Sequence, residues 1–435
     1  MRATDLFTED FSTTPYWQDA TPQPVPGQVA LPDEADVVIV GAGYTGLNAA
    51  LQTARAGLST LVLDAESPGW GCSTRNGGQV STSIKPSFAA LTRRYGEALA
   101  RALLEEGQAS LDYMHALVAE EKLDCDFKQV GRFHGAHKPH LYDALARECT
   151  GGHPIWDTGA YAVPKAEMAR ELGTDAYHGG VVYPHHASID VGKYHPALLG
   201  RVREAGALVK GHCAVSALSR DGAGFAVETA QGTVRAGKVI LATNGYSGPL
   251  SPWHRSRVIP IGSYVIATEE IPRAVMDKIM PTDRVLSDTR KLVYYYRPSP
   301  DRKRILFGGR VSLSETDPRK SAVKLHRELV RLFPQLKTTR VSHSWMGFVG
   351  YTFDTMAHCG EDRGLFHAMG YCGSGVGMAS YLGMRTGRAA AGLEGVGERS
   401  AFSRISFPTR PLYAGNPWFL APSVLVYRLR DRIGV

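Results

Sequence analysis

Short uninterrupted runs of apolar residues alternate with helical patterns near the start of the chain. Residues 36–40 form one such run and end at a glycine, residues 44–56 place apolar positions at helical spacing, and residues 58–63 form a second run. Strands that are buried on both faces of a parallel sheet have this uninterrupted pattern. A strand, a helix and a strand within about 30 residues therefore predict a βαβ unit.

Further along the chain, helical periods give way to short alternating strands. Residues 86–122 are helical in period, while the strands of residues 225–236 lead into an apolar run at 238–245. Strand-like runs separated by Pro and Asp turns fill residues 263–311, and residues 365–395 pass through glycines into an Ala/Gly-rich helix. We expect an α/β protein in which a Rossmann-like domain is combined with a mixed-sheet domain.

The composition narrows the class of protein. The 435 residues are 43% hydrophobic and 21% charged, which excludes a disordered chain, a collagen-like repeat and a small disulfide scaffold. The formal net charge of +7 is compatible with a nucleic acid, an anionic membrane, or an anionic cofactor and substrate. Six cysteines without a CxxC pair predict reduced thiols and no metal site. Without a signal peptide or an apolar run of about 20 residues, we expect a cytoplasmic protein that does not span a membrane.

A GxGxxG motif follows the first apolar run and opens the first helix. Gly41 permits the tight turn, Gly43 lets a pyrophosphate approach the backbone, and Gly46 allows close packing of helix on strand. Asp64 closes the second run, 18 residues after Gly46 (64 − 46), where an acid can bind a ribose hydroxyl. Strand, helix and acid in this register predict a dinucleotide site, although they do not separate FAD from NAD.

Three further segments do separate the two cofactors. Residues 239–245 are similar to the downstream strand of flavoproteins that bind two dinucleotides, residues 73–79 read STRNGGQ, and residues 370–378 form a glycine loop that opens a helix. Together they resemble the D-amino-acid oxidase (DAO-type) family of FAD-dependent amine oxidoreductases. The resemblance is strongest to the bacterial gamma-glutamylputrescine oxidoreductases and covers nearly the whole chain. It also includes residues 69–72, 123–127, 195–196, 333–337, 345 and 427–435.

The resemblance implies the fold, the cofactor and the reaction. The fold would be a glutathione-reductase/DAO-type FAD domain plus a mixed-sheet substrate domain. FAD would take a hydride at N5 from the carbon next to an amine nitrogen, the imine would hydrolyse to an aldehyde, and O2 would be reduced to H2O2. The substrate would be a carboxylate-bearing amine, such as a gamma-glutamylated amine. We expect non-covalent FAD, because residues 347–351, where sarcosine oxidases carry their attachment cysteine nearby, read GFVGY. The lysine that helps those relatives react with O2 is absent from residues 304–308.

The same resemblance and the motifs yield a set of cofactor-binding candidates spread over the chain. They are Gly41, Gly43, Tyr44, Thr45, Gly46, Asp64, Ala65, Ser73, Arg75, Asn76, Gly77, Gly78, Gln79, Ala214, Val215, Thr243, Asn244, Gly373, Ser374, Gly375, Val376 and Gly377.

Four residues are candidates for the substrate side. Tyr264, Tyr296 and Trp345 offer aromatic walls for an alkylamine, and Arg310 offers a guanidinium for a carboxylate. Tyr294 and Tyr296 share one face of a strand and Tyr295 takes the other, with core packing as the competing interpretation. The histidines at 134, 137, 140, 185 and 186 have no acidic or thiol partner in the pattern, so we expect no metal.

The expected division into domains is discontinuous. We predict an N-terminal arm at 1–33, an FAD domain from 34–125, 190–255 and 340–395, a substrate domain from 126–189 and 256–339, and a C-terminal extension at 396–435.

The C-terminal extension leaves two interpretations open. Residues 420–432 mix apolar residues with three arginines as an interfacial helix would, although we favour a solvated helix packed on the body. The expected partners are a small amine and O2, with no nucleic acid and with the oligomeric state open. Alternatives are an N-methyl or cyclic imino acid oxidase, a quinone-linked dehydrogenase and, remotely, an RNA-binding flavoprotein.

Overall fold

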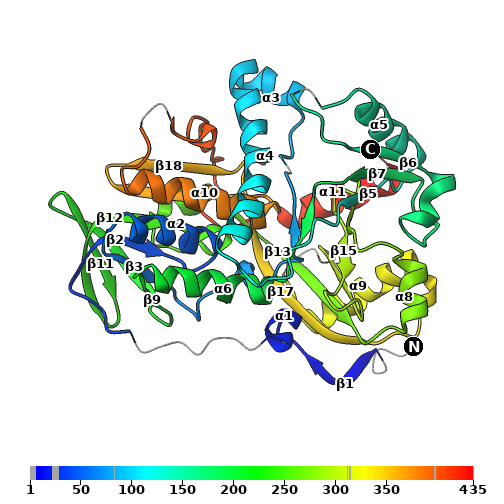
Figure 1. Ribbon diagram of the computed structural model, residues 1–435, viewed down its shortest axis with the longest axis horizontal. Helices are drawn as coiled ribbons and strands as arrows, with labels where there is room; N and C mark the ends of the chain where they lie inside the picture. The colour runs from blue at the N-terminus through cyan, green and yellow to red at the C-terminus, as the bar shows by residue number, and fades with distance from the viewer. Residues whose placement is uncertain are drawn as a thin grey trace.

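Two large β-sheets carry most of the strands among the described residues (Figure 1). The computed structural model describes residues 6–21, 29–82, 84–153, 155–310, 312, 315–395 and 398–434. The parts of the predicted arm at 1–5 and 22–28 therefore lie outside the described residues.

The first sheet contains the predicted βαβ unit. Strand β2 (Glu34–Val40), helix α2 (Tyr44–Arg55) and strand β3 (Thr60–Leu63) follow one another, and the two strands pair in parallel with Val38 opposite Leu61. The path of the sheet is β10-β11-β12-β2-β3-β9, with β19 beside β12 and β18 beside β19. The remaining strands are β9 (Leu208–Lys210), β10 (Val215–Asp221), β11 (Gly224–Thr229), β12 (Gly232–Leu241), β18 (His358–Asp362) and β19 (Leu365–Met369).

The second sheet has the order β1-β17-β13-β16-β15-β14-β5-β7-β6 in the described part of the chain. Its longest pairing joins β13 to β17 in antiparallel register, from Ile259 opposite Tyr351 to Thr268 opposite Val341. The strands are β1 (Phe7–Ser12), β5 (Arg132–Gly135), β6 (Tyr161–Pro164), β7 (Gly179–Tyr183), β13 (Ile259–Thr268), β14 (Val285–Asp288), β15 (Tyr295–Pro298), β16 (Ile305–Gly309) and β17 (Val341–Tyr351).

Two predicted domain boundaries differ from this arrangement. We placed residues 340–395 in the FAD domain, but β17 lies inside the second sheet because its whole length pairs with β13. We placed residues 1–33 in an arm, but β1 extends the same sheet by pairing with β17. Both errors concern strand partners that are far away in the sequence, which local patterns do not specify. The division into domains otherwise stays a prediction.

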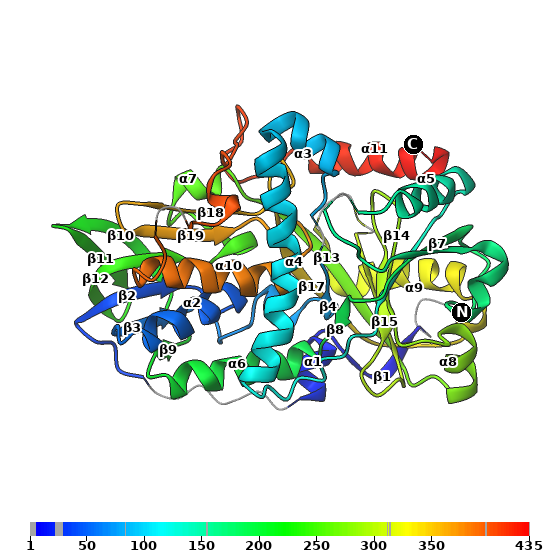
Figure 2. The ribbon, with the colours of Figure 1, turned by 45° about the horizontal axis from the view of Figure 1, so that its top comes forward.

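Helices surround both sheets. Helix α4 stands between the half of the molecule that contains the first sheet and the half that contains the second (Figures 1 and 2). Helix α10 packs closely on α2, because a Cβ at Gly383 would lie 2.4 Å from the Thr45 carbonyl oxygen and one at Gly387 would lie 2.5 Å from that of Ala49. Two glycines thus bring the backbones of the two helices together. The helices are α1 (Tyr16–Ala20), α3 (Phe88–Tyr95), α4 (Glu97–Glu120), α5 (Pro139–Thr150), α6 (Val191–Glu204), α7 (Pro252–Arg255), α8 (Arg273–Ile279), α9 (Pro318–Leu332), α10 (Gly375–Ala390) and α11 (Leu420–Ile433).

The C-terminal helix α11 lies along the outer edge of the half that contains the second sheet, next to α5 (Figure 2). His137 bonds through Nε2 with the carbonyl oxygen of Asp431 at 3.2 Å, and His140 bonds in the same way with that of Gly434 at 2.6 Å. Within the described residues, no helix has the length and apolar character needed to cross a membrane.

Candidate active site

A cavity of about 1750 Å³ lies between the two sheets. The first sheet contributes the loops before α2 and α10, the second contributes parts of β13, β16 and β17, and α11 contributes one of its faces. Typical ligand pockets measure roughly 300–1,000 Å³, so this cavity has room for a dinucleotide together with a substrate.

The glycine loop before α2 opens into this cavity. Gly41 has a φ of +107°, which glycine adopts readily, and a Cβ at Gly46 would lie only 1.9 Å from the Gly41 carbonyl oxygen. Gly43 precedes the helix and has no side chain with which to cap it, so the first turn of α2 presents N–H groups toward the cavity wall. This is the arrangement that the motif predicts.

Asp64 braces the glycine loop from the end of β3. Its carboxylate accepts hydrogen bonds from the backbone N–H of Ala42 at 2.7 Å and of Glu66 at 3.0 Å. Burial raises the pKa of this carboxyl group above its usual value. Asp64 and Ala65 both line the cavity. The position of Asp64 is compatible with a contact to a ribose, which stays a prediction.

The loop from Ser73 to Gln79 is held by its own polar groups. The Asn76 amide donates to the Ser73 carbonyl oxygen at 3.0 Å and accepts from the N–H of Gly78 at 2.8 Å. The Tyr44 hydroxyl donates to the same Ser73 oxygen at 2.5 Å. These bonds connect the loop to the start of α2, so both segments form one wall of the cavity.

Two buried tryptophans support this loop from behind. Trp17 donates from Nε1 to the carbonyl oxygen of Asn76, and Trp345 donates from Nε1 to that of Arg75, both at 2.9 Å. We predicted Trp345 as a substrate contact, but its side chain is fully buried and does not line the cavity. Its ring fills the core and its N–H holds Arg75, so its observed contacts are structural.

The start of α10 forms the second helix N-terminus at the cavity. Gly373, with a φ of +98°, Gly375 and Val376 line the wall, and the Thr45 hydroxyl meets the Tyr371 hydroxyl at 2.6 Å. That hydrogen bond and the close packing of α10 on α2 place both helix N-termini at one end of the cavity.

Most predicted cofactor residues line this cavity. Three that do not are Gly46, Gly78 and Gly377, which lie behind the wall. A Cβ at Gly78 would lie 2.3 Å from the Ile189 carbonyl oxygen, so this glycine is required by packing. The lining candidates are Gly41, Gly43, Tyr44, Thr45, Asp64, Ala65, Ser73, Arg75, Asn76, Gly77, Gln79, Ala214, Val215, Thr243, Asn244, Gly373, Ser374, Gly375 and Val376.

Of the three tyrosines at 294–296, the predicted substrate residue Tyr296 does not line the cavity. Tyr296 is 1% exposed and packs on Phe307 with ring centroids 5.5 Å apart, as Tyr294 does at 5.4 Å. The two tyrosines share a face as predicted, but Tyr295 on the other face lines the cavity and bonds Ser263 at 2.9 Å. Alternation identifies the two faces of a strand, whereas the position of the cavity depends on the packing of the second sheet.

Two further substrate candidates are engaged within the protein. The Tyr264 hydroxyl donates to Glu315 at 2.9 Å and accepts from the N–H of Thr316 at 2.7 Å, away from the cavity lining. Arg310 does line the cavity, but its guanidinium pairs with Glu315 at 2.9 Å and bonds the Gly262 carbonyl oxygen at 2.8 Å. The carboxylate of Glu315 therefore neutralises the positive charge of Arg310 that would otherwise attract a substrate carboxylate.

Another arginine, Arg132, lies on the cavity wall at the start of β5. Its guanidinium lies over the Tyr183 ring at 4.8 Å, and His134 and His186 line the same part of the cavity. Burial, together with the charge of Arg132, lowers the pKa of His134 to about 3 and that of His186 well below its usual value. The only signal for Arg132 in the sequence was its place at the start of a short strand.

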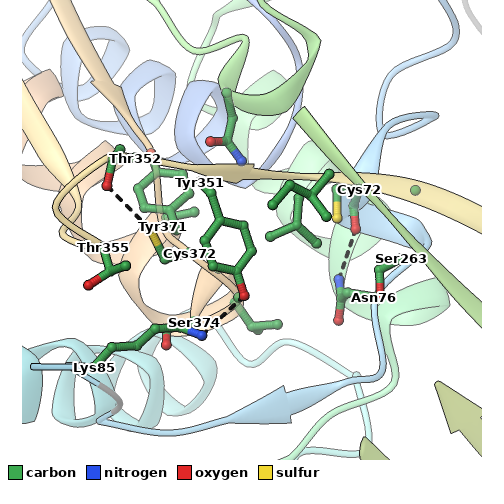
Figure 3. A pocket seen from close by; sticks show the side chains of 18 of the residues that line it. Cys72, Asn76, Lys85, Ser263, Tyr351, Thr352, Thr355, Tyr371, Cys372 and Ser374 are labelled. Carbon is green, nitrogen blue, oxygen red and sulfur yellow. Dashed lines mark hydrogen bonds between the residues drawn. The ribbon is translucent and has the colours of Figure 1, made fainter. Parts of the chain in front are cut away.

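Lys85 enters the cavity from the loop that precedes α3. Its ammonium group donates to the Tyr351 hydroxyl at 3.1 Å and lies beside Ser374 at the start of α10 (Figure 3). Interaction with Tyr351 raises the pKa of Lys85 despite its burial, so the group is cationic at neutral pH. Residues 304–308, where the resemblance led us to expect a lysine, contain none, and Lys85 comes from a segment that carries no such motif.

The residues present fit FAD. A Cβ at Gly375 would meet none of the described atoms within 4 Å, and one at Gly373 would first meet the Tyr351 hydroxyl at 3.7 Å, so open space borders the α10 loop. Two helix N-termini offer N–H groups and partial positive charge to an anionic cofactor. Among the described residues, no group of three or more His, Cys, Asp or Glu side chains is arranged to hold a metal ion.

Known proteins resemble this chain over most of its length. A probable oxidoreductase, OrdL, of Rhizobium meliloti is 32% identical over 434 residues, covering 96% of this chain and 97% of that protein. The gamma-glutamylputrescine oxidoreductase of Escherichia coli is 30% identical, covering 92% of this chain and 93% of that protein. The crystal structure of glycine oxidase from Geobacillus kaustophilus superposes with a TM-score of 0.70 at 18% identity, covering 86% of this chain and 98% of that one.

The structural likeness confirms the predicted α/β fold with its mixed sheet. Residues 36–389 match the family model described as FAD dependent oxidoreductase (DAO). The chain therefore belongs to the DAO family of FAD-dependent oxidoreductases.

Proposed function

We propose that the protein oxidises an amine that also carries a carboxylate, such as a gamma-glutamylated amine. The observation that carries the proposal is the cavity itself, which extends from two helix N-termini to a guanidinium, Arg132, on the second sheet. The E. coli relative, a gamma-glutamylputrescine oxidoreductase, supports this substrate class.

The chain's own residues have distinct roles in this proposal. The loops at residues 41–46, 73–79 and 373–376 would hold FAD, which supplies the acceptor for the hydride from the carbon next to nitrogen. Tyr246, Tyr295 and Tyr351 form aromatic parts of the cavity wall, which excludes water from an alkyl chain and positions it. Arg132 would bind the carboxylate and so fix the distance of the reacting carbon from the α10 end of the cavity.

The electron acceptor and the cellular setting belong to the same proposal. We include O2 as acceptor, H2O2 as product, a role in polyamine catabolism, non-covalent FAD and a cytoplasmic location. Reduction of a dye under anaerobic conditions, with no H2O2 formed in air, would instead favour the quinone-linked dehydrogenase. Flavin that stays with acid-precipitated protein would contradict non-covalent binding.

An anaerobic screen tests the substrate class. The holoenzyme is mixed with paired amines, the N-(γ-glutamyl) and N-acetyl derivatives of one diamine, and bleaching of the flavin absorbance is followed. The γ-glutamyl member should bleach the flavin at much lower concentration. Bleaching by neither member, but by N-methyl or cyclic imino acids, would refute the proposal in favour of that alternative.

Two matched variants test the carboxylate anchor. Arg132→Met should raise KM for the γ-glutamyl amine about 30-fold, which corresponds to the roughly 2 kcal/mol expected for a charge-assisted hydrogen-bond pair. KM for the N-acetyl amine should not change, and Arg132→Lys should recover part of the loss. Arg310→Met is the control, because Arg310 lines the same cavity but is paired with Glu315. Equal effects of Arg132→Met on both amines would remove Arg132 from this role.

A further inference from the structure

Helix α11 presents one face to the body of the protein. Val424 is buried, and Leu420, Ser423 and Tyr427 line the cavity from this side. The Asp431 carboxylate accepts hydrogen bonds from the backbone N–H of Lys291 at 2.6 Å and of Leu292 at 3.2 Å. The inner face is therefore fixed to the protein by apolar contacts and by its acidic side chain.

The opposite face of α11 is apolar and exposed to solvent. Leu425 is 54% exposed, Val426 51%, Leu429 59% and Ile433 60%. Spacings of one, four and eight residues from Leu425 place all four on a single face of the helix. Trp418, just before the helix, is 62% exposed. An exposed stripe of large apolar side chains is unusual on a soluble surface and marks an interaction site.

Arginines border this stripe on both sides. At 100° per residue, Arg428 and Arg432 fall on one flank of the Leu425–Leu429 line, and Arg430 falls on the other. The only acidic residue in the sequence of α11 is Asp431, whose carboxylate faces the body. The outer face of α11 is therefore apolar at its centre and cationic at both edges.

We propose that α11 docks the protein onto the surface of an anionic lipid bilayer. The leucines, Val426 and Ile433 would enter the boundary between headgroups and acyl chains, while the arginine stems extend along the apolar stripe and place their charges at the lipid phosphates. Trp418 has the amphipathic ring that is enriched at such boundaries. This is the interfacial interpretation that the mixed pattern of residues 420–432 left open.

A second copy of the chain is a less suitable partner for this face. In a twofold dimer the same patch meets itself, so the arginine rows of the two helices would approach each other. The sequence of α11 contains one acidic residue, Asp431, and its carboxylate is bonded on the inner side. An anionic surface complements the same charges.

Docking through α11 has a consequence for the cavity. Because Leu420, Ser423 and Tyr427 on the inner face form part of the cavity wall, the helix separates the cavity from the bilayer by its own thickness. The enzyme would therefore work beside the lipid phase, although docking itself does not depend on the proposed substrate.

Flotation of the holoenzyme with vesicles tests the proposal. Vesicles of phosphatidylcholine and phosphatidylglycerol (about 7:3) should carry the protein upward at low salt. About 1 M salt, or vesicles of pure phosphatidylcholine, should lower the bound fraction at least about tenfold. Leu425→Ser with Leu429→Ser should lower the partition coefficient at least about tenfold, with unchanged flavin spectrum and amine turnover. Arg430→Glu with Arg432→Glu should do the same.

A matched pair controls for the loss of any exposed leucine. Leu208 and Leu393 are 42% and 48% exposed and lie outside α11, so Leu208→Ser with Leu393→Ser should float like the wild type. The proposal is overturned if wild-type protein does not float, if the Leu425/Leu429 variant floats equally well, or if binding ignores lipid charge. A concentration-dependent dimer that the same variant dissociates, without vesicle binding, would assign the face to a second copy instead.

Discussion

The contact between α2 and α10 can be tested by adding one methyl group. In Gly383→Ala the new Cβ would lie 2.4 Å from the Thr45 carbonyl oxygen and 2.9 Å from its Cα. Ordinary contact begins at 3.4 Å, so the helices must separate by about 1 Å (3.4 − 2.4). Because both helices begin at the cavity, we expect their N-termini to lose their relative placement and FAD to bind more weakly.

Gly200 in α6 provides the matched control. A Cβ there would meet none of the described atoms within 4 Å, and the residue lies inside a helix as Gly383 does. Both alanine variants gain about 1 kcal/mol of helix propensity. The difference between them is therefore the steric cost alone, about 1–3 kcal/mol for overpacking, or roughly 1–3 °C in unfolding temperature for a chain of this length.

The assay is an FAD titration of the apoprotein together with thermal unfolding of the holoenzyme. We expect Gly383→Ala to raise the Kd for FAD about tenfold, the equivalent of 1.4 kcal/mol. Gly200→Ala should keep the wild-type Kd and unfold at the same temperature or slightly higher. If Gly383→Ala matches Gly200→Ala in both measurements, the close approach of α10 to α2 does not position the FAD site.

Three further perturbations test other parts of the site. Gly43→Val should abolish most bound FAD, because its side chain would fill the approach of the pyrophosphate; full flavin content after purification would contradict this placement. Lys85→Met should lower the reduction potential of bound FAD, by roughly 30 mV for every 1.4 kcal/mol of lost attraction to the electron-rich reduced form, while Lys85→Arg should not; equal potentials in the two variants would exclude Lys85. Burial lowers the pKa of His195 to about 4, so the unfolded imidazole takes up a proton below about pH 6.5 while the folded one does not. Stability should therefore fall as pH falls from about 6.5 to 4, more steeply in wild type than in His195→Gln, and parallel pH profiles would refute this.

The cofactor half of the site could be predicted from the sequence, because its motifs lie within short continuous segments. Gly41 and Gly46 act within a single strand–turn–helix unit, and their spacing determines a geometry that the structure shows in detail. The substrate half depends on distant pairings. Tyr295 could be separated from Tyr296 by alternation, but which of them meets the cavity depends on where β16 and β17 lie. Arg132 carries no motif, and only the pairing of β5 with β7 and β14 brings it to the wall.

The scattered order of the wall segments has a consequence for biosynthesis. The glycine loop of the cavity wall begins at Gly41, and the α10 loop reaches Val376 only 335 residues later (376 − 41). At about 5–20 residues per second, a ribosome needs roughly 17–67 s to cover that interval. The nascent first sheet therefore exposes an incomplete wall for this time, and we expect the chain to bind FAD firmly only near the end of synthesis. The availability of FAD at that moment should determine how much of the chain matures and how much reaches proteases as apoprotein.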